Sequence, residues 1–383
     1  MVQELNYVAC QISSASGLDA LQRVLLTYAG GNHIALAGDP GIGKTELIQQ
    51  MPKIIDVPLL EIGCTNDMTD SPLLGFPTLV KDGQTTVTKW VNGVITEAAD
   101  TGSLVCADEF EQLRQTVQKA LNSINDDRRA VKRRDGLVVK AQDGYGCFIS
   151  YNPGGSVARH VLEDSVADRF VHFAFKPLPA PLRAALALND FSRLNLEKRG
   201  VTYNRTDKSI QYLRNDGNKW VDFFTGNVQN DTEGIKAYNA YTDHVEYHPS
   251  APKLDSYDVA LKIEEVIDVA RNLAKNGTSS LEADEITALG VAEFSQLQLH
   301  TPSLRISKAA AWQYETLVGM GMEPEKAQAH AAQICVDQIC YGRFGERTVD
   351  GDGGATVSDV MQRMAQYKGL IGEKDQNAGL VPP

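Results

Sequence analysis

The nine residues "GDPGIGKTE" at positions 38–46 decide how the rest of the chain is interpreted. They fit the phosphate-loop pattern of glycine, four residues, glycine, lysine and serine or threonine. The strand-like run "HIALAG" (33–38) precedes them and the helix-like run "KTELIQQM" (44–51) follows, which is the context that the pattern requires. Backbone N–H groups and the helix N-terminus hold phosphates in such a loop. We therefore predict a nucleotide-binding loop made of Gly38, Asp39, Pro40, Gly41, Ile42, Gly43, Lys44, Thr45 and Glu46.

A second motif supplies the acidic groups that hydrolysis of ATP needs. Lys44 is expected to lie along the phosphates, and the Thr45 hydroxyl to bind Mg²⁺, which also needs a carboxylate from a neighbouring strand end. The apolar run "SLVCADEF" (103–110) ends in such a pair, so Asp108 is the predicted second Mg²⁺ ligand. Glu109 is predicted to orient and deprotonate the attacking water. The alternative for this pair is an ordinary charge pair at a helix N-terminus.

Three further polar residues are candidates for contacts to the phosphates. Asn152 ends the strand-like run "FISYN" and is predicted to contact the γ-phosphate, although Asn-Pro also starts turns. Arg169 stands just before a later strand and is suited to stabilise a transferring phosphoryl group, in trans, on a neighbouring subunit. Arg305 falls in the first turn of a predicted helix, where the helix dipole disfavours a cation, so we expect a phosphate partner. A helix-capping role for Arg169 and a plain surface role for Arg305 are the alternatives.

The first 176 residues alternate apolar runs with helical patterns, which predicts an α/β fold with a parallel sheet covered on both faces. A single surface helix is expected where apolar residues recur at helical spacing, at Phe110, Leu113, Val117, Leu121 and Ile124. The predicted strands are 33–38, 59–64, 102–108, 146–152 and 170–175.

Two hairpins interrupt or follow this alternation. Asp82-Gly83 in "TLVKDGQTTVTKWV" predicts one hairpin inside an insert over about residues 66–95. Asp216-Gly217 predicts another, within a polar tract over about residues 199–250 that we interpret as an insertion. Helical patterns return from residue 256. The predicted division is an α/β core at 1–176, a helical domain at 177–345 interrupted by 199–250, and a C-terminal tail at 346–383.

Composition narrows the classes of partner. The net charge of −12 argues against a nucleic-acid partner, since proteins that bind a phosphate backbone usually present a basic field. The one dense basic run, "RRAVKRR" (128–134), is interpreted as a solvated loop or as a pore-lining segment. No apolar run reaches the roughly 18 residues of a membrane span, and the N-terminus lacks a signal-peptide pattern, so we expect a cytoplasmic protein without membrane contact.

In this order the motifs resemble the AAA+ ATPases, in which a five-stranded P-loop core is followed by an all-α lid. The hairpin insert before the acidic strand resembles the MoxR branch. The segments "TKWVNGVITEAADTGSLVCADE", "NDDRRAV", "FISYNPG" and "ADRFVHFAF" are similar to those of the CbbQ/NirQ/NorQ accessory ATPases, and "TPSLRISKAAAWQYETLVGMG" is similar to their sensor-2 segment and lid.

The resemblance implies roles for the matching positions and for partners. Asn152 would be the sensor-1 residue, Arg169 the arginine finger and Arg305 the sensor-2 arginine. It implies a Mg²⁺-dependent ATPase in a homo-oligomeric, usually hexameric ring, which remodels or activates a client protein together with a von Willebrand A-domain adaptor. Two alternatives stay open: an ATP-driven nucleic-acid motor or restriction-type translocase subunit, and a nucleotide-gated scaffold that does not hydrolyse ATP.

Overall fold

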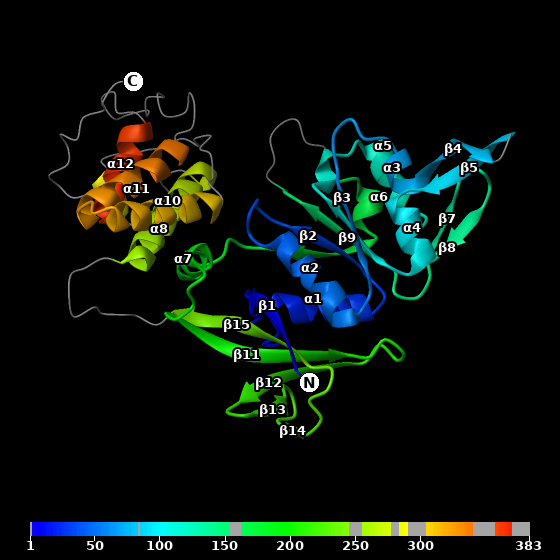
Figure 1. Cartoon of the computed structure of the whole chain (residues 1–383), viewed down its shortest axis with the longest axis horizontal. Helices are drawn as coiled ribbons and strands as arrows, with labels where there is room; N and C mark the ends of the chain where they lie inside the picture. Colours follow the sequence, from blue (N-terminus) through cyan, green and yellow to red (C-terminus); the bar gives the residue numbers. More distant parts are fainter. Residues whose placement is uncertain are drawn as a thin grey trace. The chain divides into compact units, whose positions relative to one another are not determined.

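The five strands predicted for the first part of the chain form one parallel sheet in a computed structural model of the protein (Figure 1). The structure describes residues 2–82, 85–153, 162–244, 255–276, 283–289, 304–339 and 357–369. Contacts between residues divide the chain into two units, which we name the core unit and the helical unit. The core unit is Met1–Pro177 with Leu196–Thr242, and the helical unit is Leu178–Asn195 with Asp243–Pro383.

Strand order places three strand ends side by side in the core unit. The order is β10 (Phe170–Ala174), β2 (His33–Ala37), β9 (Gly146–Tyr151), β6 (Leu104–Asp108) and β3 (Leu59–Gly63), and every pairing is parallel. The carboxyl ends of β2, β9 and β6 are therefore neighbours at one edge of the sheet. After β2 the chain continues to strands on one side of β2, and it later returns to β10 on the other side. Ligands of open α/β sheets bind at such a switch point.

Helices cover both faces of this sheet. Ile34 and Leu36 of β2 point into one apolar cluster with α1 (Ala20–Ala29) and α2 (Lys44–Ile55), whereas Ala35 points into a second cluster on the opposite face. That second cluster includes residues of α4 (Val94–Thr101). The alternation follows from the two-residue period of a strand, and the continuous apolar runs follow from burial on both faces.

The polar tract around 199–250 interrupts the sequence of the helical unit, as predicted, but it forms a second sheet that belongs to the core unit (Figure 1). Val201, Tyr212 and Tyr238 of this sheet share an apolar cluster with α1, so α1 lies between the two sheets. The hairpin predicted around Asp216 is confirmed as β12 and β13. In spatial order the strands are β1 (Gln3–Ala9), β15 (Lys236–His244), β11 (Leu194–Tyr203), β12 (Ile210–Asp216), β13 (Lys219–Asp222) and β14 (Val228–Gln229).

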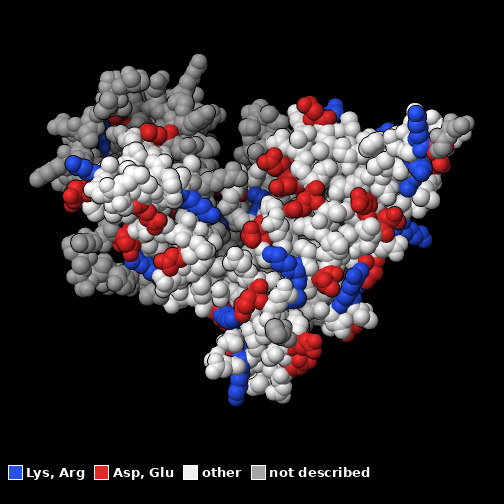
Figure 2. All heavy atoms as spheres, in the orientation of Figure 1, with Lys and Arg blue, Asp and Glu red and all other residues white. Residues whose placement is uncertain are grey.

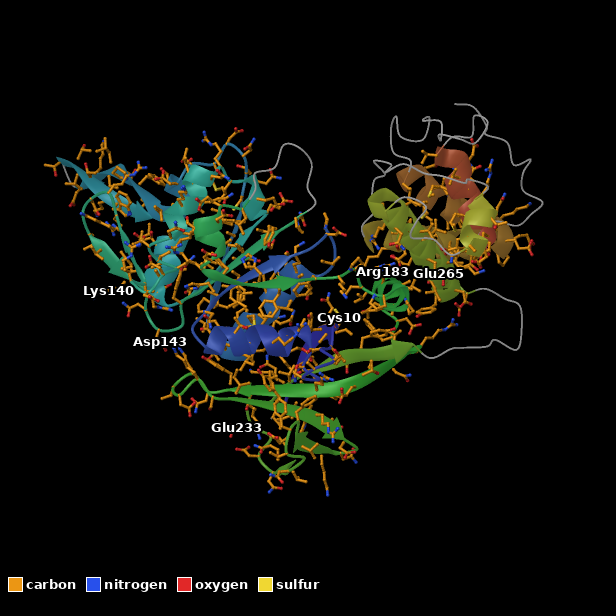
Figure 3. The ribbon with its side chains drawn as sticks, turned by 180° about the vertical axis from the view of Figure 1, so that it is seen from behind. Cys10, Lys140, Asp143, Arg183, Glu233 and Glu265 are labelled. Carbon is orange, nitrogen blue, oxygen red and sulfur yellow. The ribbon has the colours of Figure 1, made fainter. Side chains whose placement is uncertain are left out.

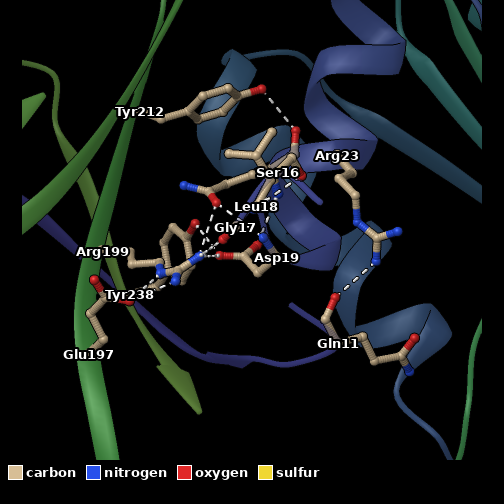
Figure 4. Close-up of polar contacts among 11 residues, drawn as sticks. Gln11, Ser16, Gly17, Leu18, Asp19, Arg23, Glu197, Arg199, Tyr212 and Tyr238 are labelled. Carbon is tan, nitrogen blue, oxygen red and sulfur yellow. Dashed lines mark hydrogen bonds and ion pairs between the residues drawn. The ribbon is translucent and has the colours of Figure 1, made fainter. Parts of the chain in front are cut away.

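A buried ion pair joins the second sheet to the start of α1 (Figure 4). Asp19 caps α1 by accepting a hydrogen bond from the backbone N–H of Gln22, and its other carboxylate oxygen contacts Arg199 Nη1 at 3.2 Å. The Tyr238 hydroxyl donates to the same Asp19 oxygen at 2.9 Å. The Asp19 and Arg199 side chains are 0% and 4% exposed, so neither can be rehydrated if its partner is lost.

The predicted insert hairpin is confirmed as β4 (Gly75–Asp82) and β5 (Thr85–Asn92), which pair antiparallel after the short helix α3 (Ser71–Leu74). Gly83 of the predicted turn lies outside the described residues. A third hairpin contains the basic run: β7 (Ala130–Lys132) pairs with β8 (Val138–Lys140).

The prediction of a single helix over 110–124 is wrong. The chain forms a 3₁₀ turn, η1 (Phe110–Gln112), then α5 (Gln115–Gln118) and a second 3₁₀ turn, η2 (Lys119–Leu121). Leu113 and Arg114 are extended between η1 and α5, with ψ of 137° and 143°, which stops helix propagation. The five apolar residues of the stripe are nevertheless all buried in the core. Burial of the stripe was predictable from its spacing, whereas the break was not.

The helical unit is built from α7 (Ala180–Leu188), α8 (Ser256–Asn276), α9 (Ala283–Leu289), α10 (Leu304–Gly319), α11 (Pro324–Ile339) and α12 (Val357–Tyr367). Val360, Met361 and Met364 of α12 are buried in its apolar cluster, so this part of the expected tail belongs to the fold. Arg183 of α7 forms a buried ion pair with Glu264 of α8. Figure 3 labels Arg183 and Glu265, the residue that follows Glu264 on α8. Among the described residues, no helix is long and apolar enough to cross a membrane.

Replacing Arg199 tests the buried pair against an exposed one on the same strand. We expect Arg199→Met to lower the free energy of unfolding by about 3–5 kcal/mol, because it leaves the Asp19 carboxylate buried without its cation. Lys198 pairs with Glu4 at side-chain exposures of 44% and 59%, so Lys198→Met should cost less than about 1 kcal/mol. Urea unfolding measures the free energy of unfolding of both variants. Equal losses would contradict the larger contribution that we assign to the buried pair of Arg199 and Asp19.

His33 gives the core unit a pH-dependent stability. Its Nδ1 accepts the backbone N–H of Cys147 at 3.2 Å, and burial, with a smaller effect of Arg129, lowers the pKa of His33 to about 4. The unfolded chain binds this proton near pH 6.5, so the stabilisation is complete above that pH and is lost as pH falls towards 4. The free energy of unfolding falls by a total on the order of 3 kcal/mol over this pH range. Urea unfolding at pH 7 and 4.5 should show that the unmutated protein loses more stability than the variant His33→Asn. The amide oxygen of the variant still accepts from Cys147 but does not titrate. Equal losses of stability in the two proteins would contradict the prediction.

Candidate nucleotide-binding site

The loop between β2 and α2 is held by two glycines that no other residue replaces easily. A Cβ on Gly38 would stand 2.3 Å from the Ile42 side chain and 2.9 Å from the Phe175 carbonyl oxygen. Gly43 caps α2 with φ of 89°, a left-handed value that favours glycine. The loop thereby delivers the chain into α2 with the helix N-terminus at the carboxyl edge of the sheet, where N–H groups attract anions.

Lys44 is the buried centre of the site. Its ammonium group donates to the carbonyl oxygens of Gly38 at 2.7 Å and Asp39 at 3.0 Å, and to Asn152 Oδ1 at 3.0 Å. An ammonium group has three donors, and these acceptors match that number. Asn152 directly follows β9, the neighbour of β2, and this adjacency brings together residues that are far apart in the sequence.

The end of β6 holds Asp108 in a fixed orientation. Its Oδ1 accepts hydrogen bonds from the Ser150 hydroxyl and from the backbone N–H of Glu109 at 3.1 Å. Its Oδ2 lies 3.5 Å from the Thr45 hydroxyl. A hydroxyl and a carboxylate oxygen at this separation are hard oxygen donors of the kind that Mg²⁺ prefers. The predicted Thr45 and Asp108 pair therefore fits Mg²⁺.

Glu109 leaves β6 in a left-handed conformation, with φ of 53° and ψ of 42°. This conformation is uncommon for a residue other than glycine and costs of order 1 kcal/mol. It ends the strand abruptly, leaves the Glu109 side chain exposed, and turns the next residue, Phe110, into the core. Such strain at the predicted catalytic acid is of the kind that gathers at functional sites.

Two residues that contact the predicted site residues were not predicted from the sequence. Ser150 supplies the hydroxyl that orients Asp108, and Glu111 accepts a hydrogen bond from Asn152 Nδ2 at 3.2 Å. Ser150 is a polar residue inside an otherwise apolar strand, which is a usable signal. Glu111 carried none, because a helix over 110–124 would have turned it to solvent, whereas η1 buries it to 3% exposure.

Arg169 lies at the opposite edge of the sheet from the loop of its own chain. It precedes β10, whose first residue Phe170 pairs with His33, the first residue of β2. The five residues of β2 separate the two edges by roughly 16 Å. The guanidinium Nη2 lies 4.0 Å from Asp126 Oδ2, and the side chain is 27% exposed. It lines a pocket of about 410 Å³ together with Asn32, Asp126 and Asp168.

Arg305 belongs to the first turn of α10, as predicted, but its side chain lies outside what the structure describes, as do Thr301 and Pro302 of the predicted cap. Two residues later, the buried Ser307 donates a hydrogen bond to Glu264, the partner of Arg183. This network fixes the first turn of α10 within the helical unit.

The comparisons with known proteins agree with this geometry. A family model described as AAA domain (dynein-related subfamily) matches residues 33–170. This part of the chain is similar to AAA domains. The matched segment runs from the first residue of β2 to the first residue of β10. It contains the loop, the acidic strand end, Asn152 and Arg169. The predicted resemblance to AAA+ proteins, and to the CbbQ, NirQ and NorQ proteins among them, is confirmed.

Three curated relatives match the same part of the chain. Protein CbbQ of Hydrogenophilus thermoluteolus is 33% identical over 43% of this chain and 60% of its own length. The denitrification regulatory protein NirQ of Pseudomonas aeruginosa is 32% identical over 38% of this chain and 55% of its own. Protein NorQ of Paracoccus denitrificans is 32% identical over 39% and 54%. The match thus spans little more than half the length of these relatives.

Proposed function

We propose that this protein is a Mg²⁺-dependent ATPase of the MoxR type that remodels or activates a partner protein. The observation that carries the proposal is the meeting of Lys44, Asp108 and Asn152 at three adjacent strand ends. Lys44 and the loop amides hold the phosphates, Thr45 and Asp108 hold Mg²⁺, and Glu109 activates the attacking water. This arrangement is that of a phosphoryl-transfer site, in which positioning and electrostatics supply most of the catalysis.

We also propose that the site is completed by a second copy of the chain. Arg169 is separated from its own loop by the length of β2, so its guanidinium acts on the nucleotide of a neighbour in a ring, usually a hexamer in this family. Arg305, at the start of α10, would couple the nucleotide to the helical unit.

A protein client suits the exposed surface better than a nucleic acid. The insert hairpin exposes the apolar residues Phe76, Leu79 and Val91, at 45%, 72% and 42%. Exposed apolar groups of this kind mark protein contacts. The relative named a denitrification regulatory protein supports a regulatory role. Activation of an enzyme, a von Willebrand A-domain adaptor and a cytoplasmic location are part of the proposal.

The basic run gives little support to a nucleic-acid motor. Arg128 pairs with Asp126, Arg133 with Asp135 and Arg134 with Asp70. Arg133 also stacks over Trp90 of β5 at 5.0 Å, so it joins two hairpins of the core unit. Acidic and basic residues alternate over the described face in Figure 2, rather than forming the basic stripe that a phosphate backbone attracts.

Replacing Glu109 tests the hydrolytic assignment. Glu109→Gln keeps the size of the side chain but removes the base, so we expect kcat for ATP to fall by about 100-fold or more, with nucleotide affinity nearly unchanged. Steady-state phosphate release and equilibrium nucleotide binding measure the two effects. The exposed Glu61 of β3 provides the control, because Glu61→Gln should leave kcat unchanged. Unaltered turnover in Glu109→Gln would show that the hydrolytic assignment is wrong.

A further inference from the structure

Asn152 lies between a group that only accepts hydrogen bonds and a group that only donates them. Its Nδ2 donates to Glu111 Oε1 at 3.2 Å, and its Oδ1 accepts from Lys44 Nζ at 3.0 Å. A carboxylate has no proton to give and an ammonium group has no lone pair. The opposite amide orientation would set Nδ2 against Lys44 and Oδ1 against Glu111, which are two repulsive contacts. The two neighbours therefore fix which atom of the amide faces which side.

Burial keeps Glu111 in this role. The residue is 3% exposed, and η1 holds it directly after Phe110, which is 0% exposed. Lys44, at 8% exposed, is nearly as buried. Rotating the amide would need a rearrangement of a packed polar network, where unmatched groups cost much more than they do in water.

We propose that Glu111 is a positioning residue for the ATP hydrolysis described above, and that it makes Asn152 present an acceptor, Oδ1, to the nucleotide. The inference rests on the proposed function and refines it. An acceptor suits the Lys44 ammonium or an O–H of the attacking water, but not a phosphate oxygen, which is itself an acceptor. Asn152 thus responds to the γ-phosphate through Lys44 or water, rather than by the direct contact expected from the sequence.

The contacts of Lys44 suggest how the response works. Its three donors match the acceptors on Gly38, Asp39 and Asn152, so a bound phosphate oxygen has to replace at least one of them. Asn152 keeps its hydrogen bond to Glu111 when Lys44 turns to a phosphate. Its Oδ1 then faces the site with an open lone pair, to which the attacking water donates.

Reversing the polarity of the pair tests the proposal. Asn152→Asp still offers an oxygen to Lys44 or water, but opposes two carboxylates at Glu111, so we expect kcat to fall by about 100-fold. Glu111→Gln keeps an acceptor for Asn152 but adds a donor that can face Asn152 Oδ1, so we expect kcat to fall by about 3-fold to 10-fold. In the double variant the amide introduced at position 111 can donate to the carboxylate introduced at position 152, and kcat should recover at least about 10-fold over Asn152→Asp alone. Steady-state phosphate release by the full chain measures all four proteins, with thermal unfolding alongside.

The outcomes separate positioning from mere structural support. Asn152→Asp combined with Glu97→Gln, an exposed acid in the first turn of α4, controls for net charge and should give no recovery. Recovery of the unfolding temperature without recovery of kcat would overturn the positioning role, as would a loss in Glu111→Gln as large as that in Glu109→Gln. If Asn152 donated directly to phosphate, the reversed pair would stay inactive. Absence of hydrolysis by the unmutated chain would instead overturn the proposed function, and this inference with it.

Discussion

The hydrogen bond between the Lys44 ammonium group and Asn152 Oδ1 is the contact on which the site depends. It exists because β2 and β9 are parallel neighbours, so a loop that follows one strand meets a side chain that follows the other. The same edge receives Asp108 from β6, two positions along the sheet. Everything that packs against the two faces of this sheet serves to hold these strand ends in place. Changes far from the loop that loosen the sheet should therefore act on the nucleotide site through this one contact.

The second sheet illustrates how that support is built. Arg199, on a strand that is distant in sequence, neutralises the residue that caps α1, and α1 packs against β2. The sequence could not reveal this partnership. The polar tract around 199–250 has weak periodicity, and the strand pairings that define it, such as β1 with β15, join the two ends of the core unit. Pairings at such separation depend on tertiary packing rather than local propensity. An insertion was predictable here, whereas its attachment to the core was not.

Elements with strong local signals were predicted well, and the subtler parts of the site were not. The five strands, the loop and both turn-marked hairpins followed from apolar runs, glycines and Asp-Gly pairs, whose effects are local. The extended conformations of Leu113 and Arg114 break the helix predicted for 110–124, and the sequence did not indicate this break, because the stretch carries an apolar stripe whether or not its turns are continuous. The buried position of Glu111 was hidden for the same reason. The backbone at Leu113 and Arg114 thus departs from the helix that the spacing of the apolar side chains predicts.

We propose that each chain holds part of a hydrolytic site and lends Arg169 to its neighbour. Co-assembling Arg169→Ala chains, which keep Glu109, with Glu109→Gln chains, which keep Arg169, tests it directly by ATP hydrolysis. Each variant alone should be inactive. A random equal mixture should regain activity at about a quarter of its interfaces, where an intact Glu109 meets an intact Arg169. Replacing the second partner by the Arg169→Ala/Glu109→Gln double variant should abolish the gain. Activity of the mixture no greater than the mean of the separate variants would contradict a shared site.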